Sequence, residues 1–120
     1  MDRSSRGLNN YLNGISAEEC VERAYCDAGA EVAERRWRGK SGEVDLIFKA
    51  GSMFIFVEVK RAKNFRTASE RVTIRQIGRI ARAAEEYVAR TPLGSLTPIR
   101  IDVALVNERG ESQIMENATL

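Results

Sequence analysis

Two short segments decide the fold that this sequence predicts: Gly42-Glu43-Val44-Asp45 and Glu58-Val59-Lys60. The first segment leads into a strongly apolar run, and the second ends another such run. Because side chains alternate across a β-strand, Glu58 and Lys60 share one face of their strand and lie at its polar end. A carboxylate and an ammonium group in this place, facing Asp45 on the neighbouring strand, are unusual for a purely structural element. The pattern indicates a site that handles charge.

The two apolar runs cover residues 44–48 and 53–57 and are rich in β-branched and aromatic side chains, which favours strands. They are joined by Ala50-Gly51-Ser52, a turn-forming sequence, so we expect an antiparallel hairpin. A weaker alternation over residues 31–38 predicts a strand before this hairpin, and the apolar run over 98–106 predicts a strand after it.

Two helices are expected, each opened by a capping box, in which side chains at the first turn satisfy free backbone N–H groups. The first helix is predicted to begin at Ser16 and to end at Gly29, and the second to begin at Thr67 and to end before Pro92. In the second helix Ile74 is placed on the buried face. The order α-β-β-β-α-β predicts a mixed α/β sheet, because the helix before the last strand allows a parallel crossover.

The composition, with 43% hydrophobic and 30% charged residues among 120, is that of one globular domain. We expect a flexible segment over 1–14, a single domain over 15–120, and a short edge strand over 113–115. The longest apolar runs fall short of the roughly 20 residues of a membrane span, and the start has no apolar signal core. A cytoplasmic location is therefore expected.

The chain has no histidine and only two cysteines, Cys20 and Cys26. This composition excludes Ser-His and Cys-His nucleophile pairs as well as histidine-ligated zinc. The two cysteines fall on different faces of one predicted helix, so we expect them to be unpaired packing residues. An enzyme of this composition works with carboxylates, lysine and a hard metal ion.

Basic residues are unevenly distributed along the chain. Between Lys60 and Arg82 there are eight basic residues and one acidic residue, although the whole chain has a net charge of only +2. Such a cluster predicts a face that binds polyanions, with a solvated helix face as the alternative. Arginines four residues apart form a stripe on a helix. The residues predicted to bind nucleic acid are Lys63, Arg66, Arg71, Arg75 and Arg79.

A family resemblance is carried by three strings: Gly-Glu-Val-Asp-Leu-Ile at 42–47, Phe-Val-Glu-Val-Lys-Arg at 56–61 and Arg-Ile-Asp-Val at 100–103. From about Ala17 to Val106 the sequence resembles the YraN-like family of bacterial proteins. Through that family it is similar to the PD-(D/E)xK nuclease superfamily, which includes restriction endonucleases and archaeal Holliday-junction resolvases. The resemblance implies a restriction-endonuclease-like αβββαβ core with a mixed central sheet.

The resemblance also implies roles for particular residues. Asp45 and Glu58 would bind Mg²⁺ or Mn²⁺, with the backbone carbonyl of Val59 as a further ligand, and Lys60 would orient the attacking water. The first-helix glutamate of the superfamily maps best to Glu18. Where the family has a lysine in the second helix, this chain has Gln76.

The roles of three residues stay open: Gln76, Glu43 and Asp102. Glu43 shares the face of Asp45 and either contacts a ligand or forms a salt bridge with Arg38 or Lys40. For Asp102 we favour a structural role.

The main hypothesis is a metal-dependent nuclease-fold protein that hydrolyses DNA backbone, with branched or damaged DNA as candidate substrates. The alternative is a nucleic-acid-binding module that keeps the fold without catalysis, and a third reading is a domain that holds only a structural ion. A two-fold homodimer would suit the cutting of both strands of a branched substrate.

Overall fold

The computed structural model describes residues 3–119, with side chains from residue 13 onward. Five strands form one mixed sheet in the order β1-β2-β3-β4-β5. The strands are β1 (Glu31–Arg38), β2 (Glu43–Ala50), β3 (Met53–Arg61), β4 (Ile99–Val106) and β5 (Ser112–Met115). The helices are α1 (Arg3–Asp27), α2 (Phe65–Glu70), α3 (Ile74–Val88) and the 3-10 turn η1 (Gly94–Leu96). Strands β3 and β4 are parallel, and the other neighbours are antiparallel.

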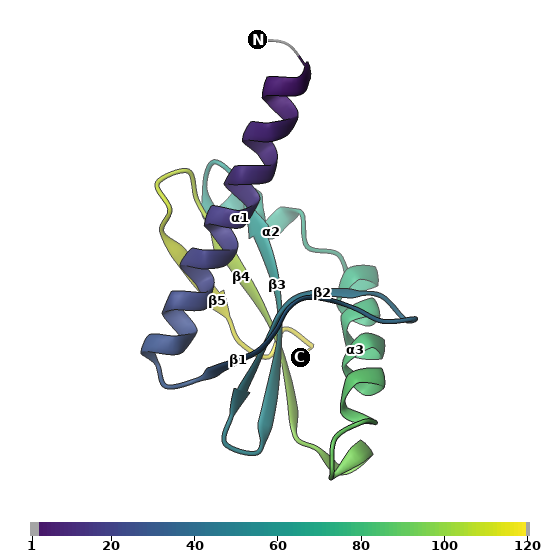
Figure 1. The fold of residues 1–120 in the computed structure, drawn as a ribbon. Coiled ribbons are helices and arrows are strands. Elements are labelled where there is room, and N and C mark those ends of the chain that lie inside the picture. Colours follow the sequence, from purple (N-terminus) through teal and green to yellow (C-terminus); the bar gives the residue numbers. More distant parts are fainter. Residues whose placement is uncertain (1–2, 120) are drawn as a thin grey trace.

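Helix α1 covers one face of the sheet, and α2 and α3 lie against the other (Figure 1). Strand alternation supplies both cores. Leu46 and Phe48 of β2 pack against α1, whereas Ile47 packs against α3. The N-terminal part of α1 extends past the sheet (Figure 1).

The mixed α/β class is confirmed, as are the hairpin, the first strand over 31–38, the parallel crossover and the edge strand near 113–115. Cys20 and Cys26 are unpaired, as predicted. Cys20 is partly buried and its thiol donates to the carbonyl of Gly110, but Cys26 is exposed, so the prediction that it packs is wrong. Among the described residues, no helix combines the length and apolar character needed to cross a membrane. The cytoplasmic location stays a prediction.

The predicted helix starts are wrong. Helix α1 begins at Arg3 rather than at Ser16, so Ser16 lies inside the helix. Residues 1 and 2 lie outside the described part, and the predicted flexibility of 1–14 stays a prediction. The second helix is two helices, because Asn64 caps α2 and Thr73, in extended conformation, caps α3. The capping box therefore pairs Thr73 with Gln76 and does not involve Thr67.

The buried face of α3 differs from the expected one. The side chain of Ile74, predicted to be buried, is 92% exposed. The residues of α3 that are buried are Ile80, Ala83, Ala84 and Val88. Their spacing of three and four residues places them on one helical stripe against the sheet.

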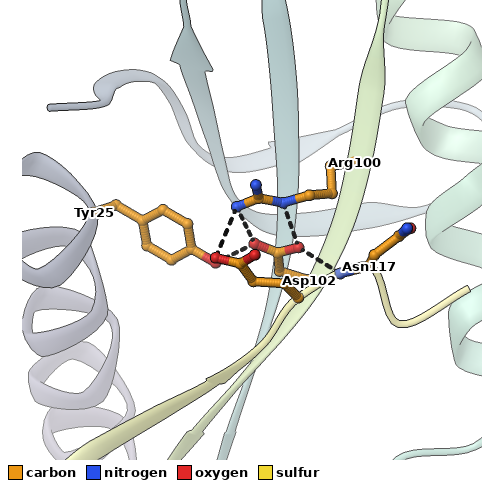
Figure 2. A network of polar contacts seen from close by, with 5 residues as sticks. Tyr25, Arg100, Asp102 and Asn117 are labelled. Atoms are coloured by element: carbon orange, nitrogen blue, oxygen red, sulfur yellow. Dashed lines mark hydrogen bonds and ion pairs between the residues drawn. The ribbon is translucent and has the colours of Figure 1, made fainter. Parts of the chain in front are cut away.

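A buried polar network ties α1, β4 and the segment after β5 together (Figure 2). The carboxylate of Asp102, fully buried in β4, accepts from the hydroxyl of Tyr25 at 2.6 Å. It also accepts two hydrogen bonds of 2.9 Å from the guanidinium of Arg100 and one of 3.0 Å from the backbone N–H of Asn117. Every donor that faces the carboxylate is thus matched, and the structural role favoured for Asp102 agrees with these contacts.

We expect Asp102→Asn to lower the free energy of unfolding by about 3–5 kcal/mol, because an amide nitrogen would face donors and the partner charge would stay buried. Tyr25→Phe, which removes one hydrogen bond, should cost about 1–2 kcal/mol. Urea unfolding measures both. Glu116→Gln is the control, because Glu116 is exposed and lies 3.7 Å from Arg100. An Asp102→Asn protein as stable as the control would contradict the network's importance.

Candidate active site where β2 and β3 separate

The candidate site lies where two paired strands part. Strand β2 pairs with β3 from Ala50 and Met53 as far as Leu46 and Val57, whereas β3 continues beside β4 to Arg61. Beyond that point the backbone N–H of Val59 donates to a side-chain oxygen of Asp45 at 2.8 Å. A carboxylate therefore replaces the missing strand partner of a backbone donor. This hydrogen bond holds the Asp45 side chain in the gap between the strands.

Glu58 and Lys60 follow on β3 and lie on the same face. The Lys60 ammonium is 3.3 Å from a carboxylate oxygen of Glu58, and each side chain is 19% exposed. Asp45 and Glu58 line one cleft of about 380 Å³, whose other wall is formed by Gln76 and Arg79 of α3. The structure thus brings Asp45 and Glu58 together in one cleft, whereas Lys60 contacts Glu58 but does not itself line the cleft.

Burial and mutual repulsion dominate the electrostatics of this cleft. Burial, and after it the charge of Glu58, raises the pKa of Asp45 to about 7, although the Val59 N–H acts in the opposite direction. Burial also raises the pKa of Glu58, while the Lys60 ammonium opposes that change. Two carboxylates that resist ionisation near each other form a place where added positive charge is stabilising.

Glu18 lies near this pair but outside the cleft. Its charge raises the pKa of both Asp45 and Glu58, yet its carboxylate accepts from Arg36 at 2.9 Å and lines a separate hollow of about 600 Å³ beside α1. Within residues 3–119, no three His, Cys, Asp or Glu side chains are grouped so as to hold a metal ion. A third carboxylate ligand from α1 and a ligand carbonyl from Val59 therefore stay predictions.

Glu43 and Asp102 differ in what they contact. Glu43 lines the cleft and forms an ion pair with Arg38, which is one of its two predicted interpretations. Asp102 belongs to the network on the opposite face of the sheet.

The basic residues of the chain fall into two groups. Those of β1 are engaged, since Arg35 pairs with Glu22 and Arg38 with Glu43. By contrast, no ion pair within the described part of the chain involves Lys63, Arg75 or Arg79.

The predicted stripe of three arginines on one helix is wrong. Arg71 caps the end of α2 and donates to the carbonyl of Arg61, whereas Arg75 and Arg79 belong to α3. The reason is the restart of the helix at Thr73. Arg66, also predicted to bind nucleic acid, lies on α2 and is 3.4 Å from Glu70.

Sequence reasoning missed Glu86, which anchors the β1–β2 turn. Its carboxylate accepts from the backbone N–H groups of Lys40 and Ser41 at 3.0 and 2.8 Å. A Cβ at Gly39 would lie 2.3 Å from Glu86 and equally close to the ring of Trp37, so only glycine fits there. Gly39 and Gly42 were the available signal for the turn itself. The backbone N–H donors of so tight a turn need acceptors.

The fold and this cleft define a class: a mixed α/β domain that presents two partly buried carboxylates and a lysine where a strand leaves its sheet. The chain belongs to the uncharacterised protein family UPF0102, whose model matches residues 17–106. That range contains both segments of the cleft, as well as the α3 wall.

Three relatives show how similar the chain is to other members of the family. A UPF0102 protein of Ruegeria pomeroyi is 47% identical over 115 residues, which is 96% of this chain and 94% of that protein. One from Cereibacter sphaeroides is 50% identical over 112 residues, covering 93% of this chain and 96% of the relative. One from Roseobacter denitrificans is 44% identical over 116 residues, covering 97% and 90% respectively.

We expect Asp45→Asn to change how stability depends on pH. A carboxyl group whose pKa rises from 3.8 to about 7 on folding stabilises the fold at low pH, and this contribution is lost as pH rises through that interval. Between pH 5 and pH 8, the free energy of unfolding of the variant should therefore rise by about 2 kcal/mol relative to that of the parent. This value is smaller than the full pKa shift would give, because solvent screens part of the shift. Its amide oxygen can still accept from Val59.

Urea unfolding of both proteins at several pH values measures this difference. Glu43→Gln, on the same strand but exposed, is the matched control. Parallel stability profiles of parent and Asp45→Asn would show that Asp45 ionises in the fold as it does in water.

Proposed function

We propose that this protein is a metal-dependent nuclease-fold protein that acts on the phosphodiester backbone of DNA, with branched or damaged DNA as the candidate substrate. The observation that carries the proposal is the convergence of Asp45, Glu58 and Lys60 at the separation of β2 and β3. The order α1-β1-β2-β3-α2-α3-β4, in which two helices stand where the sequence predicts one, supports a restriction-endonuclease-like core together with the parallel β3–β4 pair. The proposed chemistry is hydrolysis by in-line attack of water.

The donor set of the cleft fits Mg²⁺ or Mn²⁺. Both ions prefer oxygen ligands, and Mg²⁺ sites use one or two carboxylates together with waters and substrate phosphate. Asp45 and Glu58 would hold the ion, and its charge would offset the burial and the nearby negative charge that raise their pKa values. When bound, such an ion polarises a phosphate and makes a bound water more acidic. Glu18 and the Val59 carbonyl are further candidate ligands.

Lys60 supplies the second part of the proposed chemistry. Its ammonium is held beside Glu58 by their ion pair, so its position is fixed before substrate arrives. From there it would orient the attacking water and stabilise negative charge that develops on the phosphate. The small exposed fraction of both side chains strengthens these interactions, because water competes less with them.

The unmatched basic residues support DNA as the polyanion. Arg79 lines the cleft itself, Arg75 precedes it by one helical turn, and Lys63 lies in the connection after β3. Lysine and arginine side chains without internal partners are available to contact phosphates, which positions a nucleic acid without reading its sequence.

A nucleic-acid-binding module without catalysis is the second candidate. The observation that favours it is that, within residues 3–119, no group of three potential metal-binding side chains is assembled. This reading keeps the fold and the basic residues of α3 but assigns the cleft no hydrolytic role.

We expect Glu58→Gln to lower the rate of DNA cleavage at least about a hundredfold, because removal of a ligand charge weakens metal binding. DNA affinity should stay equal or increase, since less negative charge then faces the phosphates. Cleavage of linear and branched substrates with Mg²⁺ and with Mn²⁺, beside a binding titration, measures both quantities. Glu70→Gln, on the exposed side of α2, is the matched control.

The outcomes separate the two candidates. Full cleavage by Glu58→Gln would place the chemistry elsewhere. A parent that binds DNA yet cleaves no substrate with either ion would favour the binding module.

We expect the double variant Arg75→Gln/Arg79→Gln to bind DNA more weakly, independently of sequence, and to reduce the slope of log affinity against log salt by about two units. The control is Lys49→Gln/Arg90→Gln, which removes the same charge from the far end of β2 and from the residues just after α3. Fluorescence anisotropy at several salt concentrations measures the slopes. Equal slopes for both double variants would show that this face of α3 does not contact DNA.

A further inference from the structure

The turn between β1 and β2 is exposed, yet it is fastened to α3. It closes on itself through a hydrogen bond of 2.9 Å from the Gly39 N–H to the Gly42 carbonyl. The carboxylate of Glu86 accepts from the two backbone N–H groups at its tip, those of Lys40 and Ser41. The Glu86 side chain is only 17% exposed, and the hydrogen bond from Ser41, followed by that from Lys40, lowers its pKa. An ionised carboxylate therefore holds the tip at neutral pH.

Two further contacts attach this turn to the helix. The ring of Trp37, near the end of β1, packs edge-on against Tyr87 of α3, with 5.5 Å between the ring centres. After the tip, a Cβ at Gly42 would lie 3.9 Å from the backbone carbonyl of Arg79. None of residues 39–42 is fully buried, so the turn adds little to the core. Its attachment at several points indicates a surface turn that is held in place for contact with another molecule.

The tip lies on the flank of α3 that carries unmatched positive charge. Arg75, Arg79, Arg82 and Glu86 follow one another at intervals of three or four residues, so they form one stripe along the helix. No ion pair within the described residues involves these three arginines. Glu86 interrupts the row of positive charge, but its carboxylate holds Lys40 at the same place. The side chain of Lys40 is exposed, and it too is absent from the ion pairs of the described chain.

We propose that the β1–β2 turn is a second DNA-contacting element, in which Lys40 extends the arginine row of α3 and Glu86 is the positioning residue. This role rests on the DNA binding proposed above and adds a second side to it. Gly42 and Glu43, directly after the tip, line one side of the cleft, and Arg79 lines the α3 side. DNA is therefore held across the mouth of the cleft rather than along α3 alone.

The charge and the length of the row favour DNA as the bound molecule. From Arg75 to Glu86 the row spans about 16 Å, at a rise of 1.5 Å per residue, which is enough to follow roughly five phosphates of one strand. A lysine on a fixed turn loses little freedom when it binds, so its phosphate contact costs less than one from a mobile loop. Such contacts add affinity without reading sequence.

A titration of duplex DNA at several salt concentrations tests the contact of Lys40. Lys40→Gln should bind at least about threefold more weakly at low salt and reduce the slope of log affinity against log salt by about one unit. Lys49→Gln is the matched control, because it removes the same charge from the far end of β2. Both side chains are exposed, so both variants should fold as the parent does. Equal slopes for the two variants overturn this role and leave the proposed function intact, whereas a parent that binds no DNA overturns both.

Glu86→Ala separates positioning from charge. Loss of a negative charge beside the arginine row would by itself strengthen DNA binding, so weaker binding by a folded variant indicates a released tip. We expect binding at least about threefold weaker, together with faster hydrogen exchange of the Lys40 and Ser41 amides. Glu85→Ala is the matched control, because Glu85 is exposed and no hydrogen bond among the described residues joins its carboxylate to the turn. Circular dichroism establishes that each variant is folded.

The double variant Lys40→Gln/Glu86→Ala tests whether Glu86 acts through Lys40. We expect Lys40→Gln to cost less affinity in the Glu86→Ala protein than in the parent, because a released tip no longer presents the lysine. Additive losses overturn the positioning role. So does a folded Glu86→Ala protein that binds DNA as tightly as the Glu85→Ala control.

Discussion

The hydrogen bond from the backbone of Val59 to the carboxylate of Asp45 is the constraint on which the candidate site depends. A strand that leaves its neighbour exposes backbone donors, and a buried donor without an acceptor is costly. Here the aspartate at the point of separation provides that acceptor. The same contact fixes the carboxylate inside the cleft and sets its distance from Glu58 on the next strand. Secondary structure and site chemistry are therefore two results of one local arrangement.

The helices on the two faces of the sheet treat their charges differently. On the side of α1, acidic side chains of the helix neutralise arginines of β1, as in the pair between Glu22 and Arg35. Along α3, no ion pair within the described residues involves Arg75 or Arg79, and Arg79 lines the cleft that holds the two carboxylates. On the α1 side, internal ion pairs lower the charge available to a ligand, whereas the α3 side keeps its positive potential. Unmatched positive charge is thus concentrated along one flank of the cleft.

Local patterns in the sequence predicted the strands well, because the apolar runs around Ile47 and Phe56 carry both the strand period and the turn between them. Alternation also predicted that Glu58 and Lys60 share a face. Helix limits were harder, since Ser16 and Thr67 match the capping pattern as well as Thr73 does. Only tertiary packing decides which of these residues begins a helix. The role of Glu86 was beyond local pattern, because its partners lie in a turn far away along the chain.

The buried carboxylate of Asp102 has a consequence for the order in which the chain folds. Its partner Tyr25 is 77 residues earlier, and its partner Asn117 is 15 residues later. During synthesis, the hairpin of β2 and β3 has all of its own contacts long before the residues around Asn117 exist. We expect a nascent chain to keep β4 in contact with water until the segment around Asn117 has been made, because the bare carboxylate resists desolvation. Docking of the last segment then completes the sheet, which makes assembly of the whole domain a late and cooperative event.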